Sequence, residues 1–95
     1  MVVGVLRLEL LLWSPQNLKE KRAVVRRLLA RLREHFPVSA AETGLQDLWQ
    51  RCELGIVMVG SDEALLQGVF GRIEEEIQRL GVAEISERFT EYLHY

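Results

Sequence analysis

The sequence has 95 residues, 48% hydrophobic and 27% charged, proportions that are typical of a globular domain and exclude a disordered chain. The formal net charge of −2 excludes a protein that is basic all over. Uninterrupted apolar runs, such as residues 10–13, are too short to span a bilayer. The first residues lack the basic segment and small-residue cleavage site of a signal peptide. We therefore expect one cytoplasmic domain over residues 1–95 with no membrane partner.

Side chains alternate over residues 2–13, which predicts a strand with one face in the core. Leucines occupy every second position on the core side, whereas the other side carries Arg7 and Glu9. Asn17, followed three residues later by Glu20, resembles a capping box and predicts a helix from residue 18. That helix should end near residue 35, because Pro37 disfavours helix in the residue before it.

Residues 38–42 predict a short second strand, and Thr43-Gly44 predicts a turn. Alternation returns at residue 49 and predicts a third strand up to residue 59. Ser61 is the expected cap of a second helix that Gly81 ends. Residues 82–95 predict a last strand, in which Ile85, Phe89 and Leu93 are the expected apolar anchors.

The order βαββαβ, with right-handed crossovers, predicts an α+β fold of the ferredoxin-like kind. Its antiparallel sheet should have the strand order 4-1-3-2, with both helices on one face. The leucines of the first strand should lie under these helices, and the other face of the sheet should stay uncovered.

Positive charge is concentrated in the first helix. Residues 17–34 contain seven bases and two acids, a net charge of +5, so the remaining residues carry −7. Such a basic ridge suits the phosphate backbone of RNA, but it also suits a solvated helix face paired with nearby acids, or an acidic protein partner. Lys21 projects within the apolar arc and should reach the surface along its methylene stem. A phosphate-facing role near the start of the helix is the alternative. The candidate nucleic-acid-binding residues are Lys19, Lys21, Arg22, Arg26 and Arg33.

The uncovered sheet face mixes apolar and charged residues, which suggests a surface for self-association. A plain hydrated sheet face is the alternative. Base stacking is disfavoured, because the centres of the first and third strands carry no aromatic residue and Trp13 and Trp49 fall at strand ends. The candidate interface residues are Val5, Arg7, Glu9, Leu11, Trp13, Arg51, Glu53 and Val57.

No catalytic constellation is visible, so we expect no enzyme activity. Residues 67–72 resemble the phosphate loop of acylphosphatases, but they fall inside the second predicted helix, where the backbone amides are already bonded. The single Cys52 falls on the core side of a strand, where a buried thiol is inert, and it cannot form an internal disulfide. We predict no cofactor, no metal site and no small-molecule substrate.

Three runs together resemble the YlxP-like family of small bacterial proteins of unknown function. They are Gly4-Val5-Leu6, Leu18-Lys19-Glu20-Lys21-Arg22 and Asp47-Leu48-Trp49-Gln50-Arg51. The resemblance implies a ferredoxin-like fold, a bacterial cytoplasmic setting, and genes that often lie among those for transcription and translation factors. It implies no activity, cofactor or catalytic residue. Thr43-Gly44-Leu45 departs from the pattern of the family.

These observations lead to two hypotheses of different classes. The first is a non-catalytic cytosolic protein whose basic first helix contacts RNA or a ribosomal surface. The second is a homo-oligomeric, for example homodimeric, or protein-binding module that acts through the uncovered sheet face.

Overall fold

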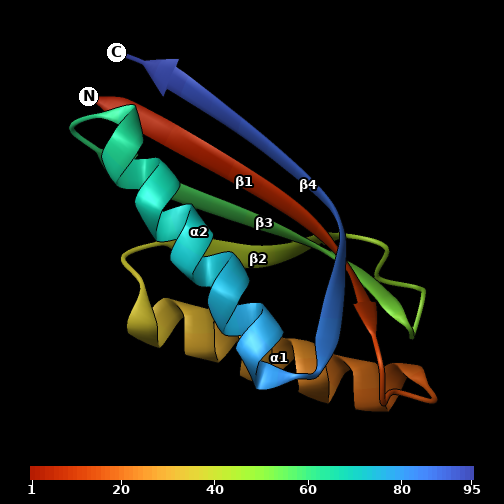
Figure 1. Cartoon of the computed structure of the whole chain (residues 1–95). Helices are drawn as coiled ribbons and strands as arrows, with labels where there is room; N and C mark the ends of the chain where they lie inside the picture. Colours follow the sequence, from red (N-terminus) through yellow and green to blue (C-terminus); the bar gives the residue numbers. More distant parts are fainter.

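A computed structural model describes residues 1–95 as four strands and two helices (Figure 1). The elements are β1 (Val2–Leu12), α1 (Leu18–His35), β2 (Ser39–Gly44), β3 (Arg51–Gly60), α2 (Glu63–Leu80) and β4 (Ala83–His94). The predicted βαββαβ order is confirmed. Neither helix is long and apolar enough to cross a membrane.

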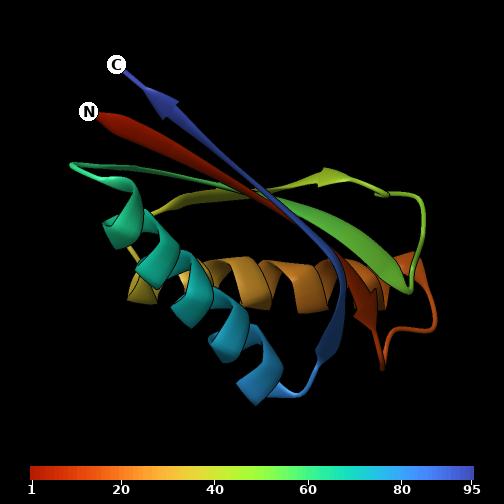
Figure 2. The same ribbon diagram turned by 45° about the horizontal axis from the view of Figure 1, so that its top comes forward.

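The four strands form one antiparallel sheet in the order β2-β3-β1-β4. This is the predicted order 4-1-3-2 read from the opposite edge, so the ferredoxin-like topology is confirmed. Both helices lie on the same face of the sheet, and no element covers the other face (Figure 2). We call the uncovered side the open face.

The core lies between the sheet and the helices, and the alternation of β1 explains it. Leu6, Leu8, Leu10 and Leu12 are buried, as predicted, while the residues between them are half-buried or exposed. The register of β1 with β3 pairs even-numbered residues with each other, for example Leu8 with Leu54. The even-numbered residues of β3 are therefore buried beside these leucines, namely Cys52, Leu54, Ile56 and Met58. The apolar stripes of the two helices complete the cluster.

The helix ends show one confirmed cap and one correction. The side chain of Asn17 accepts a hydrogen bond from the Glu20 N–H (2.9 Å), as the capping box predicts. In α2 the predicted cap Ser61 is wrong, because Asp62 has the extended backbone of a cap residue and its side chain accepts from the Leu65 N–H (2.9 Å). Gly81 ends α2 in the left-handed conformation, as predicted (φ 69°).

β4 departs from the prediction because it contains a bulge. Glu9 pairs with Glu87, but the next residue of β1, Leu10, pairs with Ile85, so Ser86 is an extra residue in β4. Its hydroxyl donates to the Glu9 carbonyl oxygen (3.0 Å). The extra residue reverses the alternation, so Ile85 packs on the core, whereas Phe89 is on the open face and 47% exposed. Phe89 and Leu93 are therefore not core anchors.

Candidate nucleic-acid interface

Three predicted binding residues lie together on the outer side of α1. At 3.6 residues per turn, Lys19, Arg22 and Arg26 fall within an arc of roughly 60°, and all three are exposed. None of them forms an ion pair with a carboxylate of the chain. We call these three residues the basic row.

Lys21 does not belong to the basic row, and the expectation that it reaches the surface is wrong. Its side chain is 1% exposed, and its Nζ lies 2.6 Å from Oε2 of Glu42. It also donates to the backbone carbonyl oxygens of Leu45 (2.8 Å) and Gln46 (3.3 Å). These three partners match the three donors of an ammonium group, so Lys21 has no donor left for a ligand.

The contacts of Lys21 also join two of the sequence runs described above. Lys21 lies in the run at the start of α1, and its carbonyl partners immediately precede the run over residues 47–51. One partner, Leu45, has a left-handed backbone (φ 60°), which is unfavourable for a leucine. The buried ammonium therefore fixes the loop between β2 and β3 against the first turn of α1.

Arg33 is bound to the backbone rather than to an acid. Its Nε and Nη2 donate to the carbonyl oxygen of Ala40 in β2 (3.1 and 2.5 Å). A neutral carbonyl does not cancel the charge of the guanidinium, so Arg33 still contributes positive potential beside the basic row, although its geometry is fixed by β2.

Most of the remaining bases are paired with acids. Glu76 accepts hydrogen bonds from Arg31 (3.1 Å) and Arg79. These hydrogen bonds, those of Arg79 foremost, hold the pKa of Glu76 below its ordinary value. Arg88 donates to both carboxylate oxygens of Glu74 (2.6 and 3.0 Å), which raises the pKa of Arg88. Acids of α2 thus neutralise bases of α1 and β4.

Half of the bases have no carboxylate partner. Six of the twelve form ion pairs (Arg7, Lys21, Arg31, Arg51, Arg79 and Arg88). The six others are Lys19, Arg22, Arg26, Arg27, Arg33 and Arg72, of which all but Arg72 belong to α1. Arg27, which is not among the predicted binding residues, is exposed on the flank of α1 and lines a hollow of about 220 Å³ beside Leu80. Free positive charge is thus concentrated on one helix.

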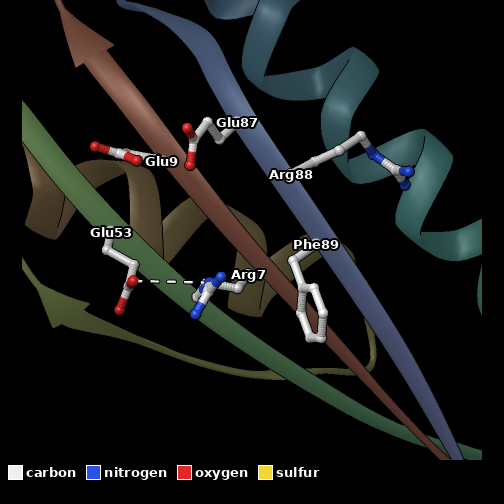
Figure 3. Close-up of a pocket in the computed structure, with 6 residues that line it drawn as sticks. All are labelled: Arg7, Glu9, Glu53, Glu87, Arg88 and Phe89. Carbon is white, nitrogen blue, oxygen red and sulfur yellow. Dashed lines mark ion pairs between the residues drawn. The ribbon is translucent and has the colours of Figure 1, made fainter.

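The predicted interface residues of β1 and β3 all lie on the open face, because their register pairs odd-numbered residues with each other. A hollow of about 210 Å³ on this face is lined by the six residues drawn in Figure 3. Arg7 lies 3.8 Å from Glu53 and 5.1 Å from the centre of the Phe89 ring. Glu9 pairs with Arg51 at 3.0 Å, whereas Arg88 points away toward α2 (Figure 3).

Cys52 is fully buried in the core, on the helix side of the sheet. Burial raises the pKa of its thiol from 9.0 to about 12, and the nearby charge of Glu42 adds to the rise. A thiol with so high a pKa is a poor nucleophile near neutral pH. The chain contains no group of three or more His, Cys, Asp and Glu residues placed to hold a metal ion.

The raised pKa of Cys52 predicts a loss of stability in alkaline solution. Above pH 9 the thiol loses its proton in the unfolded chain but keeps it in the folded chain. Ionisation therefore stabilises only the unfolded state, and the free energy of unfolding falls as the pH rises from 9 toward 12. The free energy of unfolding should fall by up to about 1.4 kcal/mol per pH unit. Urea unfolding of the wild type and of Cys52→Ala measures this component, which the variant should lack. An identical pH dependence in both proteins would contradict the burial of the thiol.

Comparisons with known proteins agree on the family and the fold. The family described as "Protein of unknown function (DUF503)" matches residues 3–88. The chain is 38% identical over 79 residues to the uncharacterized protein YlxP of Bacillus subtilis (strain 168), covering 83% of this chain and 78% of that protein.

Two solved structures share the fold at low sequence identity. The structural-genomics protein YJCS has a TM-score of 0.58 at 11% identity, covering 97% of this chain and 99% of the other. SnoaB, a cofactor-independent oxygenase from Streptomyces nogalater, has a TM-score of 0.51 at 9% identity, covering 99% and 92%. Identities this low show a common fold only. The family match and the relative in Bacillus subtilis go further, and the chain belongs to the DUF503 family of proteins of unknown function, as its resemblance to YlxP-like proteins predicts.

Proposed function

We propose that the chain is a non-catalytic protein that binds RNA through the basic row of α1. The observation that carries this proposal is the distribution of unpaired charge. The acids of the chain neutralise bases of β1, β3, β4 and α2, yet leave the outer side of α1 positive. A charged stripe of this kind attracts a polyanion even though the net charge of the chain is −2.

The geometry of the basic row suits a phosphate backbone. Lys19 and Arg26 are separated by seven residues, which is a rise of roughly 10 Å along the helix, with Arg22 between them. Each cation can neutralise one phosphate and release its condensed counterions. The basic row contains no aromatic or amide side chain that would read a base edge, so the binding should depend little on sequence.

Reversing the charge of Arg22 and Arg26 together (R22E/R26E) should reduce co-sedimentation of the protein with ribosomal RNA or ribosomes by about tenfold at low salt. The control variant is R72E/R79E, which changes the net charge by the same amount on α2. This variant removes Arg72, which is unpaired, and Arg79, which is exposed and whose surface ion pair with Glu76 contributes little to stability. We expect the control to co-sediment almost as well as the wild type.

Two results would overturn the proposal. One is equal co-sedimentation of the wild type and R22E/R26E. The other is a complex that survives nuclease digestion, because that result would assign the basic row to an acidic protein partner instead of RNA.

A further inference from the structure

The open face of β1 carries a pattern that reads almost the same from both ends. Side chains of a strand alternate between faces, so the residues exposed on this face are every second one. Two apolar residues precede a positive charge, and a negative charge precedes two more apolar residues. In chain order they are Val3, Val5, Arg7, Glu9 and Leu11 of β1, followed by the exposed Trp13 directly after the strand. A second strand of the same sequence, running antiparallel over this one, would match apolar with apolar and positive with negative.

We propose that two copies of the chain associate through their open faces, about a two-fold axis that crosses β1 at Leu8 at right angles to the strands. This axis sets Arg7 of each copy against Glu9 of the other. It also sets Val5 against Leu11 and Val3 against Trp13. Each contact occurs twice, as a two-fold interface requires.

The middle of the neighbouring strand β3 fits the same axis. Its register with β1 pairs Gly55 with Arg7 and Glu53 with Glu9, so the axis brings Glu53 of one copy over Gly55 of the other. Gly55 has no side chain and is partly covered by the side chain of Thr43, and beside these two residues and Arg7 the face is hollowed by about 450 Å³. The carboxylate of Glu53 would enter this hollow next to Arg7 of the other copy. Glu53 of the other copy would there lie near Arg7, which is 3.8 Å from Glu53 of its own chain.

The far end of β3 is also complementary. Val59 pairs with Val3 in the sheet, and the axis brings it toward the segment before β3 of the other copy, which contains the exposed Trp49. Val59 is 59% exposed and Trp13 is 56% exposed. The ends of β1 and β3 therefore present apolar side chains that no element of the chain covers, and the proposed dimer buries them together.

The open face is large enough for a stable dimer. β1 has 11 residues, or roughly 37 Å at about 3.4 Å per residue, and four strands at about 4.8 Å span roughly 19 Å. Because β2 has only 6 residues, the face covers about 640 Å² for each copy at these spacings, near the lower end of the roughly 600–1,000 Å² that each partner buries in a standard interface.

The proposed dimer is independent of RNA binding. α1 lies on the other side of the sheet (Figure 2), so the basic row of each copy stays exposed on the outside of the dimer. Failure of one proposal therefore leaves the other standing, and each has its own measurement.

Crosslinking of engineered thiols tests the dimer and its register together. The variants are Val5→Cys, Leu11→Cys and the double variant V5C/L11C, each treated with a short bismaleimide. Facing sheets lie roughly 10 Å apart, whereas positions 5 and 11 of one strand are roughly 20 Å apart. The double variant should therefore give a covalent dimer of twice 11.0 kDa, and each single variant should stay monomeric on a denaturing gel. The native Cys52 is buried and should not react.

Either of two results would overturn the proposal: light scattering that shows a monomer at all concentrations, or a covalent dimer of Val5→Cys alone, which would require a different axis. A charge swap provides a second measurement if the thiol variants fold poorly. Arg7→Glu and Glu9→Arg, each alone, place like charges together and should weaken self-association about tenfold or more. An equal mixture of the two should form heterodimers with opposite charges at both positions, and failure of the mixture to associate would contradict the register.

Discussion

Replacing Lys21 by methionine is expected to lower the free energy of unfolding by about 3 kcal/mol. Methionine keeps an unbranched apolar stem but removes the charge, so Glu42 would remain on the core side of β2 without its partner. Removing one member of a buried ion pair typically costs about 3–5 kcal/mol. We expect the lower end of that range, because the Glu42 side chain retains 18% exposure and water can partly solvate it.

Urea unfolding of three variants tests the role of Lys21. K21M/E42L replaces both charges with apolar groups and should recover much of the loss, since the unpaired carboxylate is gone. Lys19→Ala removes an exposed lysine two residues away and should change the stability by less than about 0.5 kcal/mol. If Lys21→Met is as mild as Lys19→Ala, the buried ammonium does not fix the loop between β2 and β3.

Gly4→Ala is expected to destabilise the fold by about 1–3 kcal/mol, the usual cost of overpacking a core. A Cβ atom at this position would lie 3.0 Å from Cδ1 of Leu66 and 3.0 Å from two ring atoms of Phe70. Both residues belong to α2 and are fully buried. Gly4 therefore lets α2 approach β1 closely, which gives a physical meaning to the glycine in the first of the three runs.

Gly68→Ala is the matched control for Gly4→Ala. Gly68 lies within α2, and a Cβ atom there would meet nothing within 4 Å. Alanine is more favourable than glycine in a helix by about 1 kcal/mol, so this substitution should raise the melting temperature while Gly4→Ala lowers it. A rise for both variants would show that α2 does not pack on β1 at Gly4.

Much of the fold could be predicted because its signals are local. The alternation of leucines over β1 gave the buried face, and Asn17 and Gly81 marked the start of α1 and the end of α2. The crossover rule then determined the strand order. Each signal needs only a few neighbouring residues, so no knowledge of distant contacts was required.

The misjudged residues depend on contacts between distant segments. Lys21 is buried because Glu42 and the carbonyl groups that follow β2 lie opposite it, 21 or more residues away in sequence. Arg33 is held by Ala40 of the next strand. The bulge at Ser86 has no sequence signature of its own, and it sends Phe89 to the open face. Helical spacing alone could therefore group the arginines of α1, but could not tell which bases are already bonded.

The affinity of the protein for single-stranded RNA at several salt concentrations tests the central claim most directly. If Lys19, Arg22 and Arg26 each neutralise one phosphate, the logarithm of the association constant should fall with the logarithm of the salt concentration with a slope of about −2. The slope should approach about −0.7 in R22E/R26E, in which one of these cations remains. A wild-type protein that does not bind RNA at low salt, or a slope that the double substitution leaves unchanged, would contradict the assignment of the basic row.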